Sequence, residues 1–194
     1  MTICIFGDSI TWGAWDCENS GWADLLKKYL MAESVITYNL GVSDDTTERL
    51  LQRFDTEIED RNPDIIIFAI GINDSMDIFG KKPISLVKFA DNLATLTDKA
   101  SQITNKIVFV GLTNVDEAKT IPYADTDASF DNQSIGEYDE AIRSFCEEND
   151  LIFIDVLGLL INNEDLCDGL HPSSTGHQKL FETIKDAIEP LWKE

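Results

Sequence analysis

The sequence is poor in basic residues. Lys and Arg together number 15 against 36 Asp and Glu, which gives a formal net charge of −21 at pH 7. Such an acidic surface repels phosphate backbones and anionic headgroups, so nucleic acid and anionic membrane surfaces are disfavoured as partners. The charge by itself indicates only a well-solvated surface.

Residues that bind metals are few, and their spacing does not match a metal site. The two histidines, His171 and His177, are six residues apart, so they do not share one face of a helix. No C-x-x-C pair occurs among the four cysteines, Cys4, Cys17, Cys146 and Cys167. Neither GxGxxG nor a complete phosphate-loop motif is present. We therefore expect no metal site, no disulfide framework and no cofactor.

Long hydrophobic runs are also missing. No apolar run approaches the ~18 residues that a membrane-spanning helix needs. Residues 1–10 lead from Met1 directly into an apolar run, without the basic segment and apolar stretch of a secretory leader. The sequence thus predicts a protein without a membrane span, located in the cytoplasm and with reduced thiols.

Five short apolar runs are present, rich in Ile, Val and Phe. They cover residues 2–6, 35–40, 65–70, 107–112 and 151–156. Runs that are apolar nearly throughout are typical of strands buried on both faces of a parallel sheet. Helical periodicity occurs between them, with Ser43, Asp44 or Asp45 as candidate cap of the second helix and Pro83 as the opening residue of the third.

This alternation of strands and helices predicts an α/β sandwich around a parallel sheet with right-handed crossovers. No repeat or linker interrupts the chain, so residues 1–194 are expected to form a single domain. Residues 114–131 are the one long segment without periodicity, and loops of that length are usually functional or disordered. Whether this segment acts as a lid stays open.

Chemically useful residues follow four of the five runs. Ser9 comes after the first run, Gly41 after the second and Asn73 after the third, while Asp168 and His171 come after the fifth and a short intervening stretch. Because ligands bind beyond the carboxyl ends of parallel strands, these residues are expected to meet at one edge of the sheet.

Together these residues suit acyl transfer. Ser9 is the candidate nucleophile and His171 the base that accepts its proton, while Asp168 orients the histidine. The Ser9 and Gly41 backbone N–H groups and the Asn73 side-chain amide are candidate donors to an oxyanion. Each motif alone indicates no more than a turn or a helix cap, and the case depends on their convergence.

The blocks Gly7-Asp8-Ser9-Ile10-Thr11, Gly41, Gly71-x-Asn73-Asp74 and Asp168-x-x-His171 resemble, in order, the four blocks of the SGNH (GDSL-type) hydrolase family. The resemblance covers nearly the whole chain, and Ile10 in place of leucine is its one departure. It implies a three-layer α/β/α fold with a flavodoxin-like five-stranded sheet in the order 2-1-3-4-5. It also implies an esterase or lipase with Ser9, His171 and Asp168 as triad and Ser9, Gly41 and Asn73 as oxyanion donors.

The substrate is less specified. Trp12, Asp74, Met76 and Phe79 are candidate substrate-binding residues, although Asp74, like Asp8, also fits a structural role in its own loop. The short chain favours small acyl groups on a small-molecule ester. Alternatives are a carbohydrate O-acetylesterase, a lysophospholipase or thioesterase, and a catalytically silent binding module. His177 is expected to be a packing residue, and the oligomeric state is not predicted.

Overall fold

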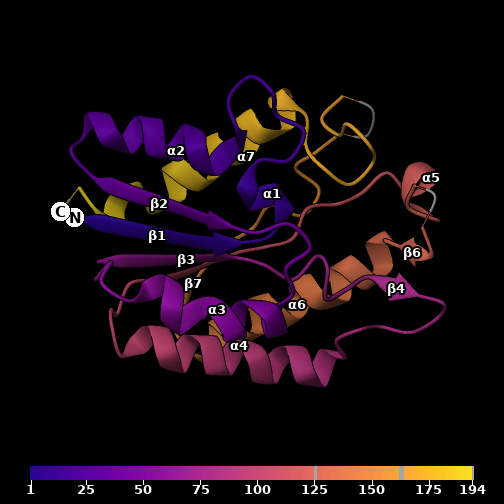
Figure 1. The fold of residues 1–194 in the computed structure, drawn as a ribbon, viewed down its shortest axis with the longest axis horizontal. Coiled ribbons are helices and arrows are strands. Elements are labelled where there is room, and N and C mark those ends of the chain that lie inside the picture. Colours follow the sequence, from indigo (N-terminus) through magenta and orange to yellow (C-terminus); the bar gives the residue numbers. More distant parts are fainter. Residues whose placement is uncertain (125, 162–163, 194) are drawn as a thin grey trace.

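The computed structural model describes residues 1–124, 126–161 and 164–193, and it has three layers (Figure 1). The middle layer is a parallel sheet of five strands: β1 (Thr2–Gly7), β2 (Ile36–Gly41), β3 (Ile65–Ala69), β5 (Ile107–Val110) and β7 (Ile152–Ile154). Their spatial order is β2-β1-β3-β5-β7. Counted among the five sheet strands this is the order 2-1-3-4-5, so the predicted α/β/α sandwich with a flavodoxin-like sheet is confirmed.

Helices cover both faces of this sheet. Helices α2 (Gly21–Ala32) and α7 (Ser174–Ile188) pack together on one face. The other face carries α3 (Thr47–Ile58), α4 (Leu86–Ser101) and α6 (Asn132–Glu148). Because both faces are covered, the interior strand β1 is fully buried from Ile3 to Phe6. This burial explains why the sequences of the interior strands β1, β3 and β5 are apolar nearly throughout rather than alternating.

Short polar side chains set where the helices begin. The side-chain oxygens of Thr46 and Ser85 accept hydrogen bonds from backbone N–H groups in the first turns of α3 and α4, and those of Asp131 and Ser173 do so for α6 and α7. The cap of α3 is thus Thr46 and not one of the three preceding residues. Helix α4 begins at Leu86, three residues after Pro83, because Ser85 supplies the cap.

Residues 114–131 contain regular structure that their sequence does not suggest. A short helix α5 (Glu117–Thr120) is followed by strand β6 (Ala128–Ser129), which pairs antiparallel with β4 (Asp77–Ile78). This pairing holds the segment beside the chain that follows Asn73. In Figure 1 both lie beyond the carboxyl ends of the sheet strands, at the opposite end of the molecule from the two termini.

A 3₁₀ turn (Glu189–Leu191) follows α7. In the part of the chain that the structure describes, none of the helices has both the length and the apolar character needed to cross a membrane. The cytoplasmic location and the single-domain organisation of residues 1–194 stay predictions.

Candidate active site

Ser9 lies at the first turn after strand β1. β1 ends at Gly7, and a Cβ at that position would lie 2.4 Å from the Ala69 carbonyl oxygen, so only glycine fits where β1 passes β3. The short helix α1 (Ser9–Trp12) begins immediately afterwards, and the Asp8 carboxylate caps it by accepting from the Ile10 N–H at 2.9 Å. Ser9 is therefore held at the carboxyl edge of the sheet and is 7% exposed.

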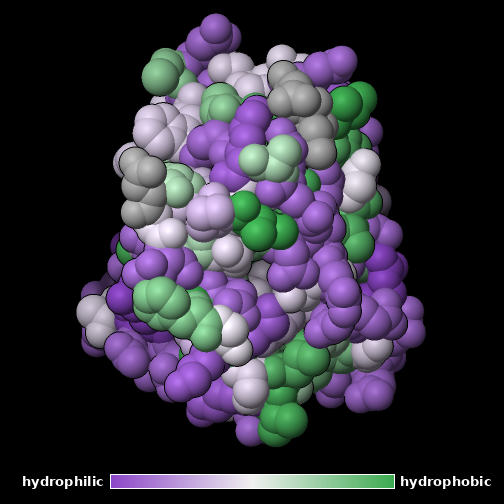
Figure 2. Space-filling view, turned by 90° about the vertical axis from the view of Figure 1, so that its right-hand side faces the viewer, coloured by the Kyte–Doolittle hydropathy of each residue, from purple (hydrophilic) through white to green (hydrophobic). Residues whose placement is uncertain are grey.

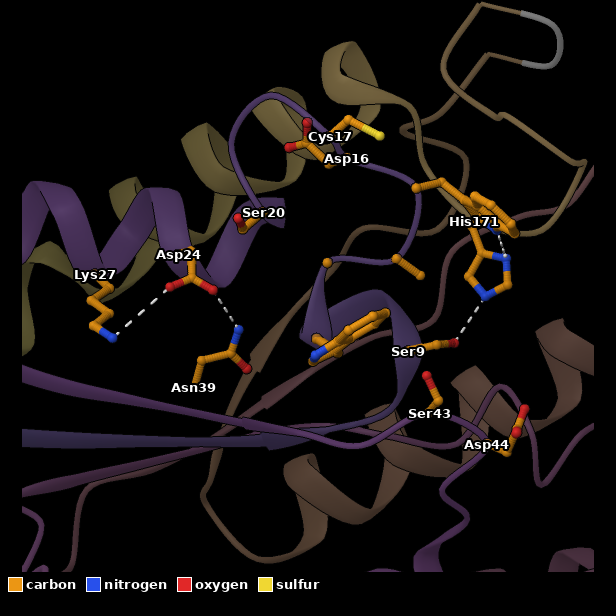
Figure 3. A pocket seen from close by; sticks show the side chains of 14 residues that line it. Ser9, Asp16, Cys17, Ser20, Asp24, Lys27, Asn39, Ser43, Asp44 and His171 are labelled. Atoms are coloured by element: carbon orange, nitrogen blue, oxygen red, sulfur yellow. Dashed lines mark hydrogen bonds and ion pairs between the residues drawn. The ribbon is translucent and has the colours of Figure 1, made fainter.

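A chain of hydrogen bonds connects Ser9 to the other end of the sequence. Ser9 Oγ lies 2.9 Å from His171 Nε2, although the two residues are 162 positions apart (Figure 3). The opposite ring nitrogen, His171 Nδ1, lies 2.7 Å from Asp168 Oδ2. Thus the three residues predicted to form a triad are brought into one hydrogen-bonded line.

The Asp168 carboxylate is held by several donors. Its Oδ1 accepts from the backbone N–H groups of Leu170 and His171 at 3.0 and 2.8 Å, and its Oδ2 faces the His171 ring. Partial burial acts to raise the pKa of Asp168, but the hydrogen bonds from His171 and from the backbone overcome it and hold that pKa well below its usual range. Asp168 is therefore an anion that fixes the orientation of the ring.

Two further aromatic residues also reach this line. The Tyr123 hydroxyl donates to Asp168 Oδ2 at 2.8 Å and lies 3.4 Å from His171 Nδ1. The Trp15 Nε1 atom lies 3.0 Å from the same Nδ1. Tyr123 belongs to the segment 114–131, so that segment contributes directly to the site. Burial and the hydrogen bond to Asp168 raise the pKa of Tyr123, which therefore stays a neutral donor.

Asn73 is positioned by a network beneath the site. Its Nδ2 donates one hydrogen bond to the Asp45 carbonyl oxygen at 2.9 Å, which leaves the second N–H of the amide for another acceptor. The Asp45 carboxylate is paired with Arg53 Nε at 2.7 Å, and Arg53 also donates to the Gly7 carbonyl oxygen. Arg53 thus connects the end of β1 to the loop that contains Asp45, the acceptor of the Asn73 amide. No local sequence motif predicts this link.

Gly41 has a different environment from the one predicted for an oxyanion donor. Its N–H donates to Asn39 Oδ1 at 3.1 Å, so this donor already has an acceptor. A Cβ at Gly41 would lie 2.3 Å from the Trp12 nitrogen, which explains the glycine by the close passage of α1 over the end of β2. In this structure Gly41 therefore serves packing, and its N–H is not free for an oxyanion.

Two clefts meet at Ser9 and His171. The first, named here the Trp cleft, has a volume of about 860 Å³ and is also lined by Trp12, Trp15, Asp16, Asp24, Asn39 and Asp44 (Figure 3). The second, the Met cleft, has about 600 Å³ and is also lined by Asn73, Met76, Ile78, Ile84, Tyr123 and Phe130. Asp44 contributes to the walls of both. Ser9 thus lines two separate clefts.

The four predicted substrate-binding residues divide between these clefts and the rest of the molecule. Trp12 lines the Trp cleft and Met76 lines the Met cleft. The prediction for Asp74 is corrected, because this residue is fully buried and accepts from the Thr47 backbone N–H and hydroxyl. Phe79 lines neither cleft and its side chain is 77% exposed, so its role stays a prediction.

Three buried titratable groups around the site have shifted pKa values. Burial raises the pKa of Asp8 to about 7 and that of Asp74 to about 6. Burial lowers the pKa of His177, whose Nδ1 accepts from the Trp22 N–H, as expected for a packing histidine. Among the described residues, no three His, Cys, Asp or Glu side chains are grouped to hold a metal ion.

Comparison with known proteins identifies the family of this chain. The model of the GDSL-like Lipase/Acylhydrolase family matches residues 5–179, which includes all the residues of the Ser9–His171–Asp168 line. The chain belongs to this family. It is accordingly a carboxylic ester hydrolase, and the SGNH (GDSL-type) resemblance inferred from the four sequence blocks is confirmed.

Relatives of this GDSL-like hydrolase match over nearly its full length. Esterase TesA of Pseudomonas aeruginosa is 22% identical over 193 residues, which are 98% of this chain and 89% of the relative. A lipase/acylhydrolase from Enterococcus faecalis superposes with a TM-score of 0.81 at 24% identity, covering 98% of this chain and 96% of the other. An acetylxylan esterase from Geobacillus stearothermophilus gives 0.79 at 20% identity, covering 96% and 93%. At these identities the structures establish the shared fold alone.

Proposed function

We propose that this GDSL-like hydrolase cleaves esters with short acyl groups through a covalent acyl-Ser9 intermediate. The observation that carries the proposal is the hydrogen-bonded line from Ser9 Oγ through the His171 ring to the Asp168 carboxylate, with distances of 2.9 and 2.7 Å. A serine hydroxyl is a weak nucleophile until a base accepts its proton, and here a histidine ring nitrogen lies within hydrogen-bond reach. The same line argues against a catalytically silent binding module, which needs none of these contacts.

The reaction follows from the positions of these atoms. His171 Nε2 takes the Ser9 hydroxyl proton while Oγ attacks the ester carbonyl carbon, and Asp168 stabilises the resulting imidazolium. When the tetrahedral intermediate collapses, the carbon–oxygen bond to the alcohol breaks and Nε2–H returns the proton to the leaving oxygen. A water molecule then attacks the acyl-enzyme with the same histidine as base, which releases the acid and restores Ser9.

We propose three donors for the oxyanion of that intermediate. The Ser9 N–H is at the start of α1, where no intrahelical acceptor exists, and the Asn73 amide keeps one N–H beyond its bond to Asp45. For the third donor we favour the backbone N–H of Asp44 over that of Gly41. Asp44 lines both clefts where they meet Ser9, and its φ of 61° is a left-handed conformation that few non-glycine residues adopt.

The assignment of the third donor can be tested without changing any side chain. Replacing the backbone amide of residue 44 by an ester in a semisynthetic protein removes its N–H and leaves every side chain in place. One lost oxyanion donor typically lowers kcat by about 10²–10³-fold. We expect that loss at residue 44 and a change below about threefold for the same replacement at residue 41. The reverse pattern would return the role to Gly41.

Labelling with a fluorophosphonate probe tests the proposed nucleophile. We expect a stoichiometric adduct on Ser9, identified by mass spectrometry, and its loss in both Ser9→Ala and His171→Ala. Ser43→Ala is the matched control because Ser43 lines the same cleft as Ser9, and this variant should label like the wild type. A folded wild-type protein that forms no adduct, or an adduct on another serine, would refute the mechanism.

A carbohydrate O-acetylesterase is the second candidate function. The polar, Trp-lined wall of the first cleft favours it, and the structural neighbour from Geobacillus stearothermophilus is named as an acetylxylan esterase. Lysophospholipase or thioesterase activity gains no comparable support from the charges around the site. Relative kcat/KM for acetylated sugars, simple acyl esters and acyl-CoA separates these activities.

A further inference from the structure

Two groups with opposite requirements meet at one ring nitrogen of His171. Asp168 Oδ2 lies 2.7 Å from His171 Nδ1, and the Trp15 indole N–H points at the same nitrogen from 3.0 Å. A carboxylate can only accept a hydrogen bond, whereas an indole N–H can only donate one. Because Nδ1 of a neutral imidazole carries either a hydrogen or a lone pair, it can satisfy Asp168 or Trp15 but not both at once.

The choice at Nδ1 determines what the other ring nitrogen can do for Ser9. When the hydrogen is on Nδ1, Nε2 has a lone pair and can accept the Ser9 proton across 2.9 Å. When Trp15 donates to Nδ1, the ring hydrogen lies on Nε2 and is donated to Ser9 Oγ. The ring cannot act as a base in that form, so the Trp15 contact belongs to the nonreactive tautomer.

The nonreactive tautomer keeps the Asp168 carboxylate well paired. Tyr123 still donates to Oδ2 at 2.8 Å, and the backbone N–H groups of Leu170 and His171 still donate to Oδ1. In the reactive tautomer, by contrast, the Trp15 N–H loses its acceptor. The charge of Asp168 favours the hydrogen on Nδ1, whereas the number of hydrogen bonds favours it on Nε2. Asp168 and Trp15 therefore oppose each other at this nitrogen.

The loop around Trp15 holds the indole beside the histidine. Trp15 has a φ of 68°, a left-handed conformation that bulky residues seldom adopt. The carboxylate of Asp16 fixes the adjacent backbone, because it accepts from three backbone N–H groups within residues 18–21 and from the Ser174 hydroxyl at the start of α7. The Trp15 and His171 rings meet edge to face, with centroids 6.3 Å apart. Unusual backbone conformations kept in place in this way are typical of functional sites.

The indole can leave Nδ1 without any movement of that loop. The Trp15 side chain is 61% exposed and lines the Trp cleft of about 860 Å³. The edge of the molecule that carries the site faces the viewer in Figure 2, where separate hydrophobic patches lie within a mainly hydrophilic surface. Rotation of the side chain into the cleft lets water accept the N–H, and Nδ1 is then left to Asp168.

We infer that Trp15 is a positioning residue that restrains the catalytic base. Its N–H competes with Asp168 for His171 Nδ1 and keeps part of the histidine in the tautomer that cannot accept the Ser9 proton. The same N–H opposes the imidazolium of the acylation step, because it would point a donor at a cation. The inference rests on the proposed function, since only a nucleophilic Ser9 needs the lone pair on Nε2. Removal of the N–H therefore raises reactivity.

The first measurement is the second-order rate of fluorophosphonate labelling of Ser9 in Trp15→Phe. The net contribution of one hydrogen bond corresponds to a rate factor of roughly two to ten, so we expect an increase of at least about twofold. Trp192→Phe is the matched control. Among the described residues Trp192 Nε1 has no hydrogen-bond partner, and its ring packs against Tyr29 near the C-terminus. Its labelling rate should equal that of the wild type.

A semisynthetic protein separates the effect of the N–H from that of ring size. Ligation at Cys17 joins a synthetic peptide of residues 1–16 to the rest of the chain without changing the sequence. The peptide can carry benzothienylalanine at position 15, in which sulfur replaces the N–H and the bicyclic ring is retained. We expect the same rise in labelling rate as in Trp15→Phe. A rise in Trp15→Phe alone would assign the effect to lost ring volume and overturn the inference.

Ring ¹⁵N NMR measures the tautomer without turnover. The chain has two histidines, and His177 is an internal reference for a lone pair on Nδ1, because that atom accepts from the Trp22 N–H at 3.2 Å. At about pH 8, where histidine side chains are ordinarily neutral, wild-type His171 should give signals between those of the two tautomers. In both Trp15 variants the signals should move toward the Nδ1–H tautomer, and an unchanged tautomer ratio would overturn the inference.

The labelling and NMR results together distinguish this inference from the proposed function. If Ser9 forms no adduct in any of the proteins, the proposed function has failed, and the NMR spectra still decide whether Trp15 competes for Nδ1. If Ser9 is labelled in the wild type but neither Trp15 variant raises the rate by about twofold, only this inference has failed.

Discussion

Replacing Tyr123 with phenylalanine removes one oxygen atom from the hydrogen-bonded line that we propose to activate Ser9. The lost atom donates to Asp168 Oδ2 at 2.8 Å, and the phenyl ring can keep its edge contact with Phe130, whose ring centroid lies 5.6 Å away. Asp168 retains three donors, namely the His171 ring and the backbone N–H groups of Leu170 and His171. The carboxylate therefore loses one quarter of its hydrogen bonds and none of its ring contact.

The size of the effect follows from that geometry. A hydrogen bond to a charged group contributes roughly 1.5–3 kcal/mol, and the three remaining donors place this loss at the lower end. About 1.5 kcal/mol corresponds to a rate factor of about ten. We expect Tyr123→Phe to lower kcat for ethyl acetate, and the second-order rate of Ser9 labelling, by about tenfold.

A double-mutant cycle separates this role from simple packing in the Met cleft, which Tyr123 also lines. If the hydroxyl acts on the Asp168 charge, Tyr123→Phe should change the Ser9 labelling rate less than twofold in an Asp168→Asn background. A tenfold effect that persists in that background would refute the reasoning and assign Tyr123 to cleft packing. A wild-type rate in Tyr123→Phe alone would refute it as well.

Three further predictions concern the residues around the serine. Burial raises the pKa of Asp8 to about 7, so the folded state keeps a proton that the unfolded chain releases above about pH 4. Stability therefore falls as the pH rises between these two values. The Tm of Asp8→Asn should decrease less from pH 5 to pH 8 than that of the wild type, and an equal decrease would contradict the assignment. Gly41→Ala places a Cβ 2.3 Å from the Trp12 nitrogen and should cost about 1–3 kcal/mol of unfolding free energy in urea titrations; an unchanged midpoint would show that α1 yields freely. Asn73→Ala removes a proposed oxyanion donor and should lower kcat by about 10²–10³-fold, whereas a loss below tenfold would remove Asn73 from that role. Because it also removes the donor to the buried Asp45 carbonyl oxygen, it should lower Tm as well.

The sequence predicts most of the fold because the fold depends on short-range patterns. The apolar runs at 2–6, 65–70 and 107–112 mark strands that are buried on both faces, and the structure places β1, β3 and β5 there. Strand β7 is shorter than its run, Ile152–Ile154 within 151–156, and in the sheet it pairs with β5 alone. Helix boundaries shift by a few residues where one cap, such as Ser85, replaces another signal, such as Pro83.

Ser9 and Asn73 could be predicted as candidate site residues because each follows a strand run, and Asp168 and His171 because they come after the last run and an intervening stretch. The carboxyl ends of parallel strands share one edge of the sheet, so residues that directly follow the strands converge regardless of their separation along the chain. Gly41 satisfied the same rule, yet its N–H donates to Asn39 and its lack of a Cβ accommodates α1. Position after a strand does not determine which way an N–H points.

The tertiary structure alone decided the rest of the site. Tyr123 reaches Asp168 because β6 pairs with β4, and this two-residue pairing joins segments about fifty positions apart without a periodic signal. Asp74 lies outside both clefts. It is buried, a buried carboxylate needs hydrogen-bond donors, and Thr47 supplies them. Local patterns of polarity and size can be read from the sequence. The direction of a side chain and its hydrogen-bond partner, in contrast, depend on which segments pack together. The sequence by itself therefore determined the sheet and its reactive edge, and only the packing decided which groups at that edge face the serine.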